Sequence, residues 1–228
     1  MGLAIEVGYL ADVLEDEEGA ADFREQLSKL NVCLKACGLN EHVEPQTCPV
    51  FSAEMYGYSG IHYLRRIAAH LDLRGKLPAP GADNAAKDPV LAEYCALFDK
   101  PKQSLFGRLF GRKQNSRHFD HLIYHSDAEG YYVPQRFTEV LFTPETMDIP
   151  GGMIGSSQQL LQETSQLAQA LQLPLDLDPE SQAVWDASDS QGKGDTLWQR
   201  YGVESFTCLR LHRAAKLSVS NSALIVFT

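Results

Sequence analysis

The sequence predicts an α+β fold, a single compact domain over residues 1–228 in which helices pack on a small mixed or antiparallel sheet. Three observations lead to this prediction. Strand-like patterns occur at both ends and in the middle of the chain, helical spacing of apolar residues fills the stretches between them, and no change of composition marks a domain boundary. With 228 residues, 44% of them hydrophobic, the chain is long and apolar enough for one sizeable core.

The first third of the chain predicts one strand and two helices. Residues 3–10 alternate apolar with small or polar side chains, which is typical of a strand. Apolar residues then recur every three or four positions over 20–37, and Gly38 follows where a helix C-cap belongs. A second helix is expected over 59–72, after a Pro- and Gly-containing loop at 39–57.

The middle of the chain is expected to form a loop at 75–89, a short helix at 88–98 and then strands. Residues 120–126 and 131–133 predict a hairpin, because Asp127 and Gly130 fit the first and fourth positions of a type I turn. Another strand is expected over 137–142.

A glycine-rich turn at 151–157 should open the next helix. This helix runs to about residue 172, and Ser156 with Gln159 matches a capping box. The last third predicts a short helix at 179–186, a long central helix at 195–219 and a buried strand at 223–227.

Charge, cysteine content and hydropathy limit the classes of function. The net charge of −10 disfavours nucleic acid as a partner and favours a basic protein. Five cysteines without a C-x-x-C pair indicate reduced thiols. We expect no signal peptide, no membrane contact, no cofactor and a cytoplasmic location, because the sequence has neither a basic leader nor a long apolar run.

Two surface patches are candidate binding sites. Residues 12–25 hold seven acids and one base, and Glu15, Asp16, Glu17 and Glu18 form the centre of this acidic run. These acids serve either as a contact for a basic partner or as a favourable start for the helix that follows. On the helix at 59–72, His62, Arg65 and Arg66 should point away from the apolar stripe, as solvated charge or as an anion or partner contact.

The densest polar cluster lies in the segment 121–134. In an extended chain His125, Asp127 and Glu129 share one face, which would suit a divalent metal or a general base with its orienting acid. The expected turn breaks this alternation and favours a structural role instead. As a third alternative, Tyr131 and Tyr132 are candidate contacts for an organic ligand or a partner.

The segment 101–118 contains five bases and no acid, with a short Leu-Phe-Gly-Arg duplication. We interpret it as an exposed flexible loop, with phosphate or lipid contact as the alternative.

Several short motifs resemble those of a family of uncharacterised bacterial cytosolic proteins. The most distinctive is His-Ser-Asp-x-Glu-Gly-Tyr-Tyr-x-Pro at 125–134. It is accompanied by Gly-Gly-Met-x-Gly-Ser-Ser at 151–157, Tyr-Leu-Arg-Arg at 63–66 and the ending Val-Phe-Thr. The resemblance covers most of the chain and assigns no catalytic residue.

Two functions from different classes fit these observations. The first is a cytosolic binding protein, an immunity or antitoxin-type inhibitor that masks a basic bacterial toxin through the acidic run. The second is a small-molecule-binding or hydrolytic enzyme that uses the 121–134 cluster and the 151–157 loop. The sequence leaves enzymatic activity open but favours the binding protein, because it contains no complete catalytic set.

Overall fold

The computed structural model describes residues 3–57, 59–81, 84–97, 117–190 and 192–227. Its centre is a six-stranded sheet with the order β2-β1-β6-β3-β5-β4. These strands are β1 (Ala4–Val7), β2 (Phe51–Glu54), β3 (Gly130–Val133), β4 (Leu141–Phe142), β5 (Met153–Ser156) and β6 (Ile225–Phe227). Only β3 and β5 pair in parallel, and the remaining neighbours are antiparallel. The predicted α+β domain with a small mixed sheet is confirmed.

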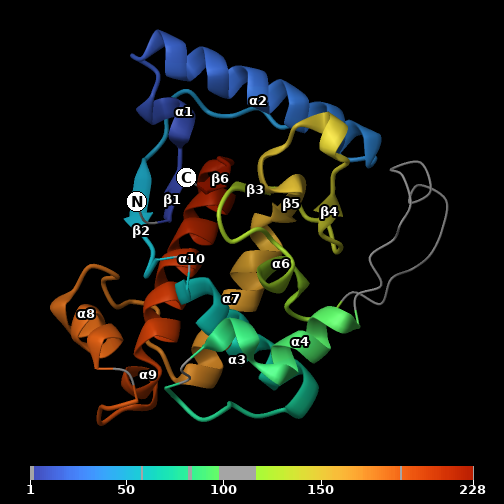
Figure 1. Ribbon diagram of the computed structural model, residues 1–228. Coiled ribbons are helices and arrows are strands. Elements are labelled where there is room, and N and C mark those ends of the chain that lie inside the picture. The colour runs from blue at the N-terminus through green and yellow to red at the C-terminus, as the bar shows by residue number, and fades with distance from the viewer. Residues whose placement is uncertain (1–2, 58, 82–83, 98–116, 191, 228) are drawn as a thin grey trace.

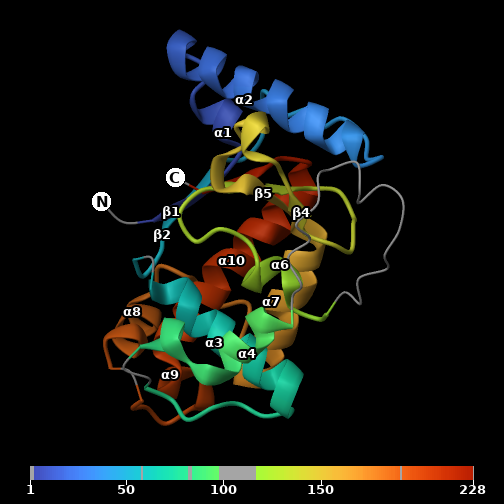
Figure 2. The same ribbon diagram turned by 45° about the vertical axis from the view of Figure 1, so that its right-hand side comes forward.

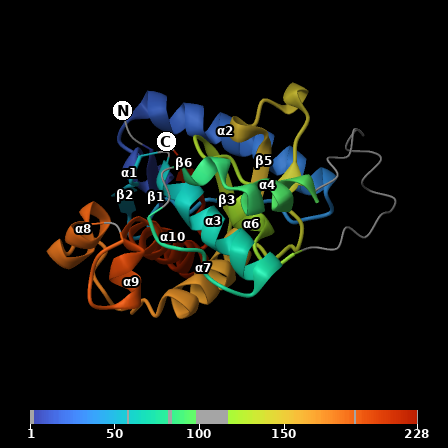
Figure 3. The ribbon, with the colours of Figure 1, turned by 60° about the horizontal axis from the view of Figure 1, so that its bottom comes forward.

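The helices cover the two faces of this sheet unequally (Figures 1 and 2). The long helix α2 (Glu17–Ala36) lies across one face, preceded by the short α1 (Tyr9–Asp12). The other face carries α3 (Ser59–Arg74), α7 (Ser157–Leu171) and α10 (Gly202–Asn221), and α7 and α10 lie side by side (Figure 3). Shorter elements surround them: η1 (Ala85–Lys87), α4 (Pro89–Ala96), α6 (Asp120–Ile123), η2 (Glu145–Met147), η3 (Pro150–Gly152), α8 (Gln182–Asp189) and α9 (Leu197–Arg200).

Alternation along the strands divides the core into two layers. Tyr132 and Phe227 pack toward α3, α7 and α10, whereas their neighbours Tyr131 and Val226 pack toward α2. Because successive strand residues point to opposite faces, one short strand supplies both layers. The sheet is therefore buried on both sides over β6 and β3.

The two helices of the first third and the terminal strand are close to their predicted positions. The helix expected over 20–37 ends with Cys37 as C-cap, and Gly38 follows with φ +75°. Glycine has no Cβ and adopts this left-handed conformation at little cost, as the position after a helix C-cap commonly requires. The helix expected over 59–72 extends to Arg74, and β6 occupies the predicted terminal strand.

Several element predictions are wrong, and long-range contacts explain most of the differences. The loop expected at 39–57 contains β2, which is held by β1 and by the bond from Met55 N to Leu3 O. The turn expected at 151–157 contains β5. The strand expected over 137–142 is reduced to the two residues of β4, and α8 begins three residues later than predicted.

The long helix expected over 195–219 is divided into α9 and α10. The break lies at Tyr201 and Gly202, where the chain passes α8 closely. A Cβ at Gly202 would lie 1.8 Å from Ala187 O, so only glycine fits this approach. The divided helix still lies centrally, as predicted, because α10 contacts α3, α7 and α8.

The predicted hairpin at 120–133 is also wrong. Residues Asp120–Ile123 form the helical turn α6, and β3 pairs with β6 and β5 instead of with its own preceding segment. The basic segment 101–118 lies outside the described residues, apart from Arg117 and His118.

Candidate functional site

The polar motif at 121–134 is mostly buried and forms a structural network. Glu163 of α7 reaches α6 and accepts hydrogen bonds from His121 N at 3.0 Å and from Leu122 N at 2.7 Å. These amides are among those that a helix N-terminus leaves without intrahelical partners. A carboxylate from a distant helix thus caps α6, and burial raises the pKa of Glu163 well above its usual range.

The two histidines of the motif serve the same network. His121 Nδ1 accepts a hydrogen bond from Ser156 N at 3.0 Å, which satisfies the amide of the N-cap residue of α7. The ring of His125 stacks on Tyr132 at 4.0 Å between centroids, and its Nε2 lies 3.1 Å from Tyr131 O. Burial lowers the pKa of both histidines to about 4, so both are neutral at pH 7.

The predicted cationic face of α3 is wrong for Arg65 and Arg66, which are buried. Arg65 donates to the backbone oxygens of Leu122 at 2.8 Å and of His125 at 2.5 Å, which fixes the motif against α3. Arg66 donates from Nε to Asp88 Oδ2 at 2.9 Å. Both guanidinium groups are used inside the fold and are not available to an external anion.

Only part of the predicted polar site is brought together. His62 Nε2 lies 2.7 Å from Asp127 Oδ2, and Arg65 Nη1 lies 3.9 Å from the same oxygen. Burial and the charge of Arg65 lower the pKa of His62, against the opposing effect of Asp127. The Glu129 side chain is exposed. The turn amides of Ala128 and Glu129 donate to the Ser126 hydroxyl.

Tyr131 and Tyr132 are not surface contacts. Their exposed fractions are 4% and 1%, and they belong to opposite layers of the core. The Tyr132 hydroxyl donates to His121 O at 2.8 Å. Both rings would have to leave the core to touch a partner.

No cluster of three or more potential metal ligands occurs in the part of the chain that the structure describes. Likewise, none of the described helices has the length and apolar character needed to cross a bilayer.

The acidic run has the opposite character, because its side chains are exposed. Glu15, Asp16, Glu17 and Glu18 all lie at the surface around the start of α2. We define the acidic end as these four residues together with Asp12, Asp22 and Glu25, which are also exposed. Of the seven, only Glu25 forms an ion pair among the described residues, with Lys29 at 3.2 Å.

The electrostatics of Tyr9 show that these carboxylates converge. Burial raises the pKa of Tyr9 first, and the charges of Glu6, Asp16, Asp12 and Asp22 raise it further. Burial and the charge of Asp12 likewise raise the pKa of Glu6. Carboxylates from β1, α1 and α2 therefore share one negative field around the Tyr9 hydroxyl.

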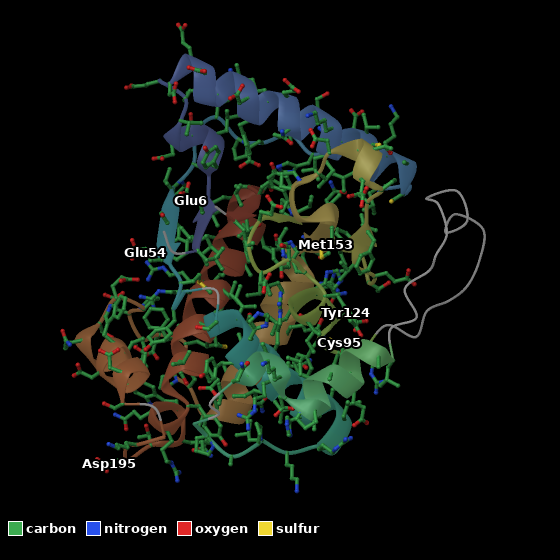
Figure 4. All side chains as sticks on the ribbon, viewed as in Figure 1. Glu6, Glu54, Cys95, Tyr124, Met153 and Asp195 are labelled. Atoms are coloured by element: carbon green, nitrogen blue, oxygen red, sulfur yellow. The ribbon has the colours of Figure 1, made fainter. Side chains whose placement is uncertain are left out.

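The two neighbouring strands β1 and β2 each carry a glutamate, one of which the sequence did not indicate as part of a strand. Glu6 of β1 and Glu54 of β2 lie on the same edge of the molecule (Figure 4). Ala4 is paired with Glu54 and Glu6 with Ser52, so both glutamates point to the face opposite the buried Ile5 and Ala53. The strand predicted at 3–10 includes Glu6, but Glu54 was missed because β2 was expected to be a loop.

Comparison with known proteins identifies the family. A family model described as "Putative DNA-mimic protein" matches residues 1–227, and no curated protein and no solved structure matches. This match corrects both functions expected from the sequence, the immunity or antitoxin-type inhibitor of a toxin and the small-molecule-binding or hydrolytic enzyme. Because the match spans nearly the whole chain, the protein belongs to this DNA-mimic family.

Proposed function

We propose that this protein binds a DNA-binding protein and occupies its DNA-binding surface in place of DNA, with the acidic end as the contact. The family match over residues 1–227 is the observation that carries the proposal. A surface that binds DNA is positively charged and shaped to neutralise rows of phosphates. A protein that competes for it must offer closely spaced negative charges on a rigid support.

The charge density of the acidic end is comparable to that of the phosphates on one side of B-DNA. Residues Glu15 to Glu25 include six carboxylates, and at 1.5 Å per residue they span about 15 Å. B-DNA carries about nine phosphates over that length, at one per 1.7 Å of axis. A partner that binds one side of a duplex contacts only part of these, so six carboxylates are a fair match.

Helix α2 holds the acidic end on a packed support, and most of its carboxylates are not engaged in ion pairs among the described residues. Phe23, Leu30 and Leu34 anchor α2 on the sheet, so the acids at its start are held by a packed helix. Six of the seven carboxylates of the acidic end have no ion pair in the described part of the chain, so a partner need not displace internal bases. The expected binding mode therefore depends strongly on charge and weakly on apolar contact.

The test is competition with duplex DNA. The full chain is immobilised, exposed to a lysate of its own cell, and then washed with a short DNA duplex or with an uncharged polymer at the same concentration. The proposal predicts that the duplex releases the bound protein and that the uncharged polymer does not. A bound protein that stays in place under excess duplex would contradict mimicry, because it would be using another surface.

A matched pair of variants locates the contact. Glu15→Gln, Asp16→Asn, Glu17→Gln and Glu18→Gln together remove four charges from the acidic end. Glu129→Gln, Glu139→Gln, Glu145→Gln and Asp195→Asn remove four exposed charges elsewhere. The first variant should lose binding at physiological salt, and the second should keep most of it. Equal losses would assign the effect to net charge and reject the acidic end as the contact.

A further inference from the structure

The outer face of α2 carries a second feature that the acidic end does not explain. Arg24, Ser28, Val32 and Lys35 follow one another at helical spacing and line an open groove of about 580 Å³, with Glu41 at its rim. Val32 has an exposed fraction of 56% although it is apolar and lies in the last third of a well-packed helix. Helix α2 forms an outer layer of the fold (Figure 2). The groove lies along its flank, beside the segment where Asn31 exchanges hydrogen bonds with the backbone of His42.

The sequence of this face is nearly symmetric about Ser28. Arg24 and Val32 lie four residues from Ser28 on either side, and Ala21 and Lys35 lie seven residues from it. A two-fold axis through Ser28 would set two copies of α2 antiparallel. Arg24 would then face Val32 of the second copy, and Ala21 would face its Lys35.

Charge favours the same arrangement. The first half of α2 is acidic, with Glu17, Glu18, Asp22 and Glu25, while Lys35 lies near its end. Lys35 pairs only weakly inside the chain, at 3.5 Å from Glu41, and both side chains are more than 60% exposed. Antiparallel packing would place Lys35 beside Glu18 and Glu25 of the second copy. The helix is thus complementary to itself in this orientation, whereas a parallel pair would oppose like charges.

We propose that a second copy of this chain docks on the groove through an antiparallel pair of α2 helices related by a two-fold axis at Ser28. Specific interfaces bury more than about 1,000 Å², and a contact made by one helix pair is at the low end of that range, so the dimer is weak and depends on concentration. The two residues at position 17 would lie about 33 Å apart along the axis, from twice eleven residues at 1.5 Å each. This spacing is close to one turn of B-DNA, about 34–36 Å, the distance between half-sites of a dimeric DNA-binding protein.

Sedimentation velocity on the purified full chain tests the interface without any partner. The expected result is a monomer–dimer equilibrium that shifts with concentration up to about 1 mM, the weak limit of measurable association. Val32→Arg, which opposes Arg24, and Lys35→Glu, which opposes Glu18 and Glu25, should each weaken it about tenfold. Lys193→Glu makes the same charge change on an exposed loop outside the interface and should have little effect.

A charge swap and a cross-link make the test specific. Adding Glu18→Lys to Lys35→Glu should restore dimerisation, because the pair is re-formed with its charges exchanged. Ser28→Cys places two thiols on the axis and should cross-link under mild oxidation far more than Ala183→Cys on α8. A protein that stays monomeric to about 1 mM, or a dimer that ignores both groove variants, would overturn the proposal.

The match between the dimer and the spacing of DNA half-sites rests on the proposed function, and a separate competition experiment tests it. The cross-linked Ser28→Cys dimer should displace a two-fold DNA-binding partner from DNA at least tenfold better than the Val32→Arg monomer, because both half-sites bind at once. Equal potency would remove the spacing argument while the sedimentation result still decides the interface. Failure of both proteins to compete with DNA would instead reject the proposed function.

Discussion

The acidic end and the motif at 121–134 differ in the burial and the bonding of their polar side chains. The motif is rich in residue types that perform chemistry, yet His121, His125 and Tyr132 are buried and bonded to the backbone. The acidic end has a simple composition, yet its carboxylates are exposed and six of the seven lack an ion pair among the described residues. Availability to a partner, not variety of functional groups, separates a binding surface from a structural network.

Mutations in the two regions should therefore change the free energy of unfolding by different amounts. Removing a member of the buried network leaves polar atoms without partners in a dry interior, which costs free energy of unfolding. Removing an exposed charge leaves only water behind, so the fold should hardly respond. The expected effects on stability run from several kcal/mol in the network to almost nothing at the acidic end.

The largest loss is expected for Arg65→Met. Two backbone oxygens, of Leu122 and His125, lose their donor inside the core, which should lower the free energy of unfolding by about 3 kcal/mol. Chemical denaturation measures this loss, with Arg24→Met on the exposed face of α2 as the control. A loss no greater than that of Arg24→Met would show that the network does not hold the motif.

The ionisation of His125 gives a pH-dependent contrast. Its pKa in the folded chain is about 4 and its ordinary value is 6.5, so protons bind to the unfolded state first. The part of the free energy of unfolding that depends on neutral His125 is fully present above pH 6.5. It is lost as the pH falls toward 4, by up to about 3 kcal/mol. The stability difference between the wild type and His125→Phe should narrow over this interval.

NMR of the histidine ring protons checks the same prediction directly. The His125 signal should stay that of a neutral ring until the pH approaches 4. A titration of His125 near its ordinary pKa would place the ring in water and contradict the buried network.

Glu163→Ala should cost somewhat less, about 2 kcal/mol, because it removes the cap of a single helical turn. His121 N and Leu122 N lose their acceptor, and α6 is short enough to unwind in response. Hydrogen exchange at these two amides measures the effect. Gln162→Ala, at the exposed neighbouring position on α7, is the control. Unchanged protection of both amides would show that α6 does not depend on Glu163.

The same contrast explains which parts of the fold could be predicted from sequence. The helices α2 and α3 and the strand β6 have local patterns that settle their structure, and Ser156 accepts from Gln159 N as its N-cap role required. The turn α6 has no such local pattern. Its partner Glu163 is 42 residues away from His121, and a residue-by-residue pattern cannot contain that contact.

Prediction of the functional region was limited in a different way. Exposure of Glu15, Asp16, Glu17 and Glu18 followed from their position before an amphipathic helix. Their partner did not follow, because a basic toxin and a DNA-binding protein present the same sign of charge to an acidic surface. Only the family match separates these two partners.

Neutralising the acidic end should change stability by less than about 1 kcal/mol. The variant with Gln or Asn at 15–18 loses favourable charge at the helix start but also loses repulsion between neighbouring acids, and these effects nearly cancel. Chemical denaturation beside Arg65→Met gives the comparison. A loss as large as that of Arg65→Met would mean that these acids support the fold and are not free for a partner.

The smallest effect is expected at Tyr9, and it examines whether the acidic end is one field or a set of separate charges. Asp12 and Asp16 both raise the pKa of the Tyr9 hydroxyl, after the larger effect of burial. The double variant Asp12→Asn and Asp16→Asn should therefore lower that pKa, measured by NMR of tyrosine labelled at the ring carbon next to the hydroxyl. Glu139→Gln, outside the acidic end, should leave it unchanged.

The shift in the pKa of Tyr9 that the aspartates cause should also shrink as salt shortens the Debye length to about 8 Å at physiological strength, because exposed charges are screened. If the pKa of Tyr9 ignores both aspartates at low salt, the carboxylates do not converge, and a partner would meet isolated charges in place of the dense row that mimicry of DNA requires.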